Sequence, residues 1–190
     1  MGSFELPEGY QEIKRVNLQK DKKLAILVNV AALVIAMAMG AVGNLIVPLR
    51  IDTSVEGLAR LLISMLAVLV GMIAYLVLHE LVHGVCIKKY SGKKAKYGFT
   101  GLYAFAGSDA YFNKRQYVVI ALTPVILFGV VFLLLNIFLP LKWFWYVYAL
   151  QIINLSGAAG DAYITNLMRK MPKDVLTNDV GIEMIIYSAE

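Results

Sequence analysis

Cysteine, histidine and charge are all scarce in this chain. Of its 190 residues, one is cysteine and two are histidine, and charged residues make up 16%. A single cysteine excludes an internal disulfide framework, so nothing argues for an oxidising compartment. The scarcity of charge excludes an ordinary soluble domain, because hydrophobic residues reach 59% here, against about 45–50% in such domains.

Nucleic acid is excluded as a partner. The net charge is +5, but the sequence has neither a Lys/Arg-rich helix nor a surface of interleaved aromatic residues. Basic loops at a membrane face explain this charge better. We therefore expect a lipid bilayer to surround much of the chain.

Long apolar runs make up most of what is present. Four runs are long enough to cross a membrane, and they predict helices over residues 24–47, 58–87, 117–139 and 143–168. The first is interpreted as a retained span rather than a cleaved signal peptide, because a long polar segment precedes it. The third contains Pro124, which interrupts its helical pattern.

Short strands are expected outside these spans. Two aromatic-rich runs, 95–99 and 102–106, are separated by Thr100-Gly101 and predict a β-hairpin after the second span. The tail has two further candidate strands, 174–176 and 184–187. We therefore predict an all-α polytopic membrane protein with four transmembrane helices and a small cytoplasmic β-hairpin after the second. Residues 1–190 are expected to form one membrane-embedded domain.

The distribution of basic residues predicts the orientation. Lysine and arginine number five in the N-terminal segment, seven in the 88–115 loop and three in the tail, while the other two connections have few. Because basic loops stay on the cytoplasmic side, both termini and the long loop are expected there. This describes a multi-pass protein of the cell membrane, with the bacterial cytoplasmic membrane as the expected location.

The second apolar run ends in the motif HExxH, formed by His79-Glu80-Leu81-Val82-His83. On a helix the two histidines lie one turn apart and face the same way, so both imidazoles can bind one divalent ion. Glu80 then lies beside them and can take a proton from a water on that ion. Ionisable groups inside a membrane span are costly and usually functional, which favours a Zn²⁺ site over two helix-facing histidines without a metal.

A catalytic zinc needs a third protein ligand. The candidates are Asp161, Asn154, Asp109, Glu183 and Cys86. Asp161 is the only acidic residue inside the first, third and fourth spans, and its depth below the membrane surface matches that of His83. It is therefore the preferred ligand, and the alternative is an ion pair with a lysine or arginine near the surface.

Four residues near these positions have two interpretations each. Asn154 can donate a hydrogen bond to the oxygen that gains charge as water attacks a carbonyl, or it can make an interhelical polar contact. Gly157 and Gly160 either loosen the helix so that Asp161 can turn toward the ion, or allow close helix packing. Cys86 is better explained as a small buried side chain than as a ligand.

Together these stretches resemble a family of bacterial multi-span membrane proteins described as putative zincin peptidases, distantly similar to site-2 protease intramembrane metalloproteases. The matching stretches are LHELVHG (78–84), YGFTGLYAF (97–105), IALTPVILFG (120–129) and NLSGAAGD (154–161). The resemblance implies that His79, His83 and Asp161 bind zinc, and that Asn154 corresponds to the upstream asparagine of the site-2 proteases. It also implies that the segment after HExxH offers a β-edge to an extended substrate.

The leading hypothesis is a zinc-dependent membrane-embedded endopeptidase acting on membrane or membrane-proximal protein substrates. Glu80 and Asn154 are its predicted catalytic residues, and His79, His83 and Asp161 its predicted metal ligands. A non-proteolytic metal-binding membrane scaffold or regulator is the alternative, since it would keep the histidines without using Glu80. A small transporter is disfavoured because no internal repeat is visible. The sequence does not define the substrate or the oligomeric state.

Overall fold

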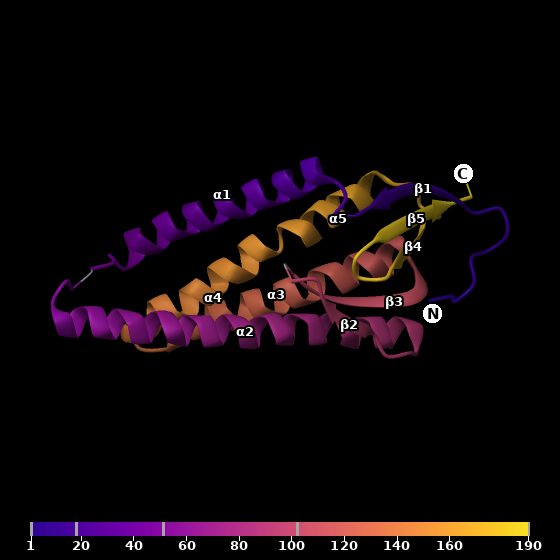
Figure 1. Cartoon of the computed structure of the whole chain (residues 1–190). Helices are drawn as coiled ribbons and strands as arrows, with labels where there is room; N and C mark the ends of the chain where they lie inside the picture. The colour runs from indigo at the N-terminus through magenta and orange to yellow at the C-terminus, as the bar shows by residue number, and fades with distance from the viewer. Residues whose placement is uncertain (1, 18, 51, 102, 190) are drawn as a thin grey trace.

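A computed structural model describes residues 2–17, 19–50, 52–101 and 103–189 (Figure 1). In chain order the elements are β1 (Gln11–Val16), α1 (Lys22–Ile46), α2 (Val55–Ser91), β2 (Lys96–Phe99), β3 (Ala104–Asn113), α3 (Lys114–Phe138), the 3₁₀ turn η1 (Leu141–Trp143), α4 (Phe144–Gly157), α5 (Ala159–Lys170), β4 (Leu176–Asp179) and β5 (Met184–Ser188). The long helices lie beside one another and the strands gather at one end of them (Figure 1). Helix α1 runs away from the strands, α2 returns, α3 runs away again, and α4 with α5 returns.

The strands form one antiparallel sheet in the order β1-β5-β4-β3-β2. The prediction of an all-α protein with an isolated hairpin is therefore wrong. The hairpin itself is present as β2 and β3, although Leu102 lies outside the described residues. Of the two tail strands, 184–187 is confirmed within β5, while the other lies two residues later than predicted, as β4.

β1 was not predicted. Its residues QEIKRV are almost all exposed, so they carry no run of buried apolar positions. The strand exists because it pairs with β5, whose own residues alternate between buried and half-buried. A partner so distant along the chain leaves no local signal.

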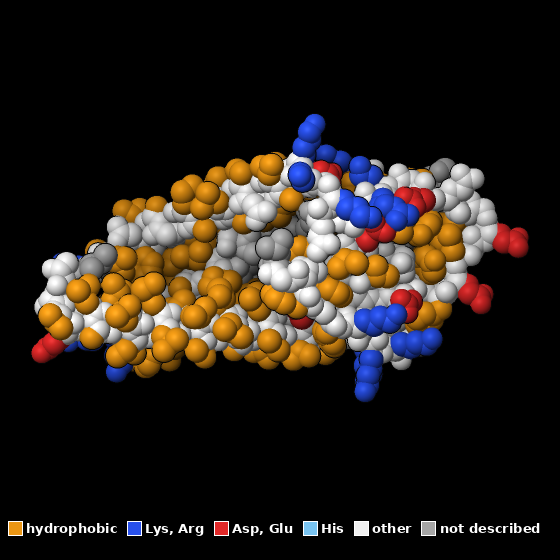
Figure 2. Space-filling model, viewed as in Figure 1, with side chains coloured by type: hydrophobic (Ala, Val, Ile, Leu, Met, Phe, Trp, Pro, Cys, Tyr) orange, Lys and Arg blue, Asp and Glu red, His pale blue; other side chains and the backbone are white. Residues whose placement is uncertain are grey.

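Three helices are long and apolar enough to cross a membrane: α1, α2 and α3. Large hydrophobic side chains are exposed along all three helices. On the face shown in Figure 2 they cover much of the surface, and charged side chains gather mainly around the sheet end. Side chains of Asp21, Ser54 and Asn113 accept hydrogen bonds from the first turns of these helices and define where each begins. This composition associates the chain with a membrane.

The prediction of a fourth span over 143–168 is wrong. The segment begins with η1 and then divides into α4, of 14 residues, and α5, of 12 residues, so among the described residues the spans number three. The backbone leaves helical geometry at Ala158, next to Gly157, which is a poor helix former. The residues of α5 include Asp161, Thr165 and Arg169, which are too polar to continue an apolar run.

The interior has two parts. A cluster at the sheet end joins α2, β3, α5 and β5 through side chains such as Ile87, Phe112, Met168 and Ile186. A smaller cluster of Tyr75, Phe132 and Val147 joins α2, α3 and α4. The histidines of α2 lie in sequence between these two clusters, so packing on both sides fixes the helix that carries them.

Gly84, directly after His83, permits the contact between α2 and the sheet. A Cβ at this position would lie 1.8 Å from the hydroxyl oxygen of Tyr97 in β2, which is far inside any real contact distance. Any larger residue would therefore displace the Tyr97 ring from this position. The glycine after HExxH leaves room for the Tyr97 side chain to lie against α2.

Candidate metal centre

The two histidines of HExxH point at a common position. They lie one turn apart on α2, and their Nε2 atoms are 3.1 Å apart. Glu80 lies between them in sequence, and the three side chains can bring one ligand atom each to within 4.8 Å of one another. His79 is only 9% exposed, so this position is inside the protein.

Asp161 reaches the same position from a distant part of the chain. It lies in the first turn of α5, just after the break at Ala158, and its Oδ2 is 3.7 Å from Nε2 of His79. A tetrahedral zinc with bonds of about 2.0–2.1 Å would hold its ligand atoms about 3.3–3.4 Å apart. The two distances found here, 3.1 and 3.7 Å, lie on either side of that value. The residues therefore fit a zinc ion with small adjustments.

A proline holds His83 in place. Pro124 lies inside α3 and has no N–H, so the carbonyl of Ile120 four residues earlier loses its usual helical donor. That carbonyl accepts a hydrogen bond from Nδ1 of His83, at 2.9 Å. Because a carbonyl can only accept, the proton of His83 is on Nδ1 and the lone pair is on Nε2.

His79 is held from the other side by Tyr75. The Tyr75 hydroxyl lies 2.8 Å from Nδ1 of His79 and donates to Oδ1 of Asn154 at 2.9 Å. The single hydroxyl proton goes to Asn154, so Nδ1 of His79 must donate to the Tyr75 oxygen. The lone pair of His79 is therefore also on Nε2.

Two imidazole lone pairs that face each other at 3.1 Å repel unless a positive charge lies between them. The nearby carboxylate of Asp161 increases the preference for a cation at that point. Two neutral imidazoles and one carboxylate are the ligand set of a catalytic zinc site, in which a fourth position stays open. The chemistry of the donors thus agrees with their geometry.

The structure accounts for the other candidate ligands. Asp109 pairs with Lys96 at 2.6 Å on the exposed surface, and Glu183 pairs with Arg15 at 2.5 Å. Cys86 is buried in the core at the sheet end, which confirms its interpretation as a small buried side chain. Asp161 forms no ion pair with lysine or arginine among the described residues, so that alternative is not supported.

The surroundings of Gly157 and Gly160 distinguish between the two interpretations of these glycines, which were close helix packing and loosening of the helix. A Cβ at Gly157 or at Gly160 would meet nothing within 4 Å, so neither glycine serves close helix packing. The break lies directly after Gly157. It places Asp161 at the start of a new helix that carries it beside α2, which supports the interpretation that glycine loosens this segment.

A cavity of about 450 Å³ adjoins the three converging side chains. Its wall combines helices α2, α3 and α5 with β3 and the turn between β4 and β5. Most of the lining is apolar or aromatic, and the polar groups include Glu80, Asp161, Tyr103 and Asp179. The cavity is large enough for several residues of an extended peptide.

Two of these polar residues, Asp179 and Tyr103, were not predicted from the sequence as parts of the site. Asp179, at the end of β4, accepts hydrogen bonds from the Tyr117 hydroxyl and from the Gly181 backbone N–H. Burial raises the pKa of its carboxyl group above the usual range, against the lowering effect of these two hydrogen bonds. Tyr103 has a buried hydroxyl group without a hydrogen-bond partner among the described residues. Asp179 belongs to no motif, and Tyr103 lies in the YGFTGLYAF stretch without being distinguishable there as a cavity residue.

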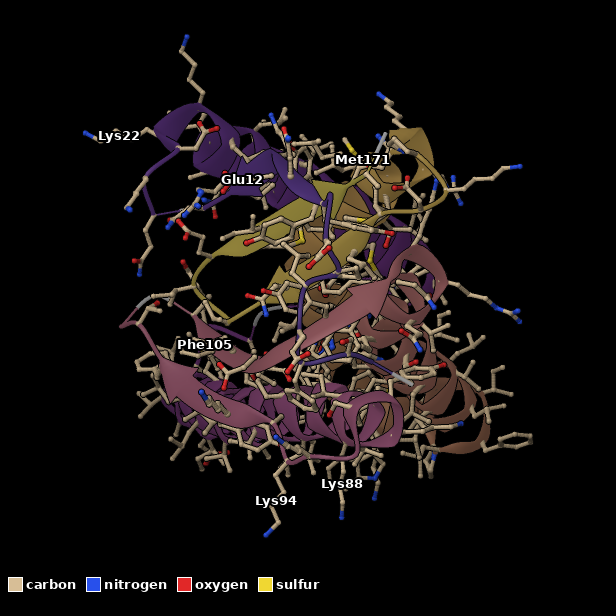
Figure 3. All side chains as sticks on the ribbon, turned by 90° about the vertical axis from the view of Figure 1, so that its right-hand side faces the viewer. Glu12, Lys22, Lys88, Lys94, Phe105 and Met171 are labelled. Carbon is tan, nitrogen blue, oxygen red and sulfur yellow. The ribbon has the colours of Figure 1, made fainter. Side chains whose placement is uncertain are left out.

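Phe105 of β3 lines the cavity and lies against the turn between β4 and β5, which is on the same side of the molecule in Figure 3. A Cβ at Gly181 would lie 1.9 Å from its ring, and one at Gly98 would lie 2.4 Å from it. Gly181 also has φ +93°, which other residues rarely adopt. The ring therefore fills a slot between two glycines.

The long apolar helices associate this site with a membrane, and an HExxH pair that faces a distant carboxylate has the donor set found in zinc metallopeptidases. A comparison with protein families agrees. The family model described as "Putative zincin peptidase" matches residues 72–176, more than half of the chain, and the chain belongs to this family. The match includes His79, Glu80, His83 and Asp161, and ends before Asp179. No curated protein and no solved structure matches the chain.

Proposed function

We propose that this chain is a zinc-dependent, membrane-embedded endopeptidase that hydrolyses peptide bonds of membrane or membrane-proximal proteins. The observation that carries the proposal is the convergence of His79 Nε2, His83 Nε2 and Asp161 Oδ2 beside a cavity that Glu80 also lines. These three side chains would hold the zinc. Membership of a zincin family supports the same chemistry.

When bound, zinc acts as a Lewis acid and lowers the pKa of water toward about 7. Glu80 takes the proton from the attacking water and later delivers it to the nitrogen of the leaving amine. Nδ1 of His83 and Nδ1 of His79 donate to the Ile120 carbonyl and the Tyr75 oxygen, so each ring presents Nε2 to the ion.

The substrate lies extended beside β3. β3 has β2 on one side and β4 on the other, but β4 pairs only with Ser108 to Asn113. Among the described residues, residues 104–106 of β3 therefore have a free edge on the β4 side. These three residues line the cavity, and the Glu80 carboxylate lies against the backbone N–H of Ala106. An extended peptide could pair with this side of β3 while its carbonyl group faces the histidines.

We propose the bacterial cytoplasmic membrane as the location, with both termini in the cytoplasm. Because β1 pairs with β5, the two ends of the described chain lie together, which supports their placement on the same side of the membrane. Lysines at the sheet end point outward, as Figure 3 shows for Lys22, Lys88 and Lys94. This agrees with the rule that basic residues remain cytoplasmic.

The test compares the wild type with Glu80→Gln in lipid nanodiscs. The matched control is Glu56→Gln, which makes the same change on α2 at an exposed residue far from the site. We expect all three proteins to bind zinc equally, and only Glu80→Gln to lose cleavage of a panel of membrane proteins. Equal zinc content with no cleavage by any form would refute the proposal and favour a metal-binding scaffold. Loss of zinc binding in Glu80→Gln would remove Glu80 from the role of base.

A further inference from the structure

A continuous line of hydrogen bonds joins His79 to the backbone of α3. Nδ1 of His79 contacts the Tyr75 hydroxyl at 2.8 Å, and Tyr75 donates to Oδ1 of Asn154 at 2.9 Å. Nδ2 of Asn154 then donates to the carbonyl of Val125 at 3.1 Å. Tyr75 is 5% exposed and Asn154 is fully buried, so both side chains are largely shielded from bulk solvent.

The donor and acceptor in each of these hydrogen bonds follow from the Val125 carbonyl, at the end of the line farthest from His79. The Val125 carbonyl can only accept, so the amide nitrogen of Asn154 must face it and the amide oxygen must face Tyr75. Tyr75 therefore gives its only proton to Asn154 and can only accept from His79. His79 is thereby restricted to the tautomer whose free lone pair is on Nε2.

The position of Tyr75 on α2 allows it to hold the His79 ring. Tyr75 precedes His79 by four residues, so the two side chains lie on one face of α2. The Tyr75 ring packs against Phe128 and Phe132 of α3, with ring centroids 5.3 and 5.8 Å apart. Packing fixes the ring, and Asn154 fixes the hydroxyl proton.

Resting on the zinc site of the proposed function, we infer that Tyr75 and Asn154 are positioning residues that select the metal-binding tautomer and orientation of His79. This assigns Asn154 a different role from donation to a reacting carbonyl oxygen. Its amide oxygen and its amide nitrogen are both engaged, and it is absent from the described residues that line the cavity. Tyr75 and His79 do line the cavity.

The experiment measures zinc affinity without substrate, by chelator competition in detergent or nanodiscs. The variants are Tyr75→Phe, Asn154→Leu and their double mutant. The control is Tyr148→Phe, which removes a hydroxyl that bonds the Met39 carbonyl away from the site. Partners behind a metal-bound histidine affect affinity about 10–100-fold. We expect each single variant to weaken zinc binding by that factor, the double mutant to match Tyr75→Phe, and the control to match the wild type.

Cobalt substitution gives a second readout, because the visible bands of Co²⁺ report ligand geometry. We expect them to shift in Tyr75→Phe and Asn154→Leu but not in Tyr148→Phe. Unchanged zinc affinity and unchanged bands in Tyr75→Phe would overturn the inference. So would an Asn154→Leu protein that loses turnover at full zinc affinity, since that result would place Asn154 at the reacting carbonyl. If His79→Ala binds zinc as tightly as the wild type, that result would instead refute the proposed zinc site itself.

Discussion

Replacement of Pro124 by alanine tests how the α3 backbone supports the metal site. In the wild type the missing N–H of Pro124 leaves the Ile120 carbonyl free to accept from Nδ1 of His83 at 2.9 Å. Pro124→Ala supplies the missing N–H, which would turn the carbonyl back toward the helix axis. We therefore expect α3 to become more regular and His83 to lose its support.

The two effects have opposite signs. Proline costs about 3 kcal/mol relative to alanine inside a helix, which sets the upper limit of the gain in stability. Loss of a partner behind a metal-bound histidine weakens metal binding about 10–100-fold, equal to about 1.4–2.7 kcal/mol. The metal-free variant should thus melt at a higher temperature than the wild type and bind zinc more weakly.

Thermal melting of the metal-free protein and chelator competition with zinc measure these quantities separately. Pro140→Ala is the matched control, because Pro140 follows the far end of α3 and precedes η1. It should leave zinc affinity unchanged. Zinc affinity within twofold of the wild type in Pro124→Ala would refute the claim that the proline frees a carbonyl for His83.

Three further predictions concern the cavity. Asp161→Ala should reduce zinc affinity by more than the roughly 10–100-fold of an outer partner, and undiminished affinity would remove Asp161 from the site. Tyr103→Phe should raise the melting temperature, because a buried unpaired hydroxyl costs about 1–3 kcal/mol, and should raise KM for peptides; a lower melting temperature would show that the hydroxyl has a partner in the protein. Burial raises the pKa of Asp179, so stability present at acid pH is lost as pH rises from about 4 through the raised pKa. Asp179→Asn should flatten this decline in the metal-free protein, and an unchanged pH profile of the melting temperature would contradict it.

The parts of the site that share one helix were predictable. His79 and His83 are four residues apart, so helical periodicity alone places them on one face. Asp161 was predictable because acidic residues are so scarce in the apolar runs. Tyr75 left a usable signal as well, since it lies one turn before His79 on the same face.

The parts that depend on distant contacts were not predictable. Asp179 reaches the cavity because β4 pairs with β3, and nothing near Asp179 in the sequence indicates that pairing. Tyr103 lies in the predicted hairpin, but the hairpin pattern alone does not place it at the cavity. The fourth span was overpredicted because the sequence stays apolar up to Gly157, while the polar residues of α5 follow too closely to be separated by average hydropathy. The sheet was underpredicted because β1 has an exposed, mixed pattern.

The pairing of β1 with β5 has a consequence for how the molecule assembles. β1 precedes every helix and β5 follows them all, yet the two strands exchange hydrogen bonds from Gln11 with Ser188 to Val16 with Met184. β1 must therefore wait for β5, so the two strands can pair only after the helices between them have been synthesised. Until then the wall of the cavity formed by the β4–β5 turn is missing. A nascent or truncated chain would hold HExxH without the surroundings that make it a selective site, which delays maturation until translation of β5 is complete.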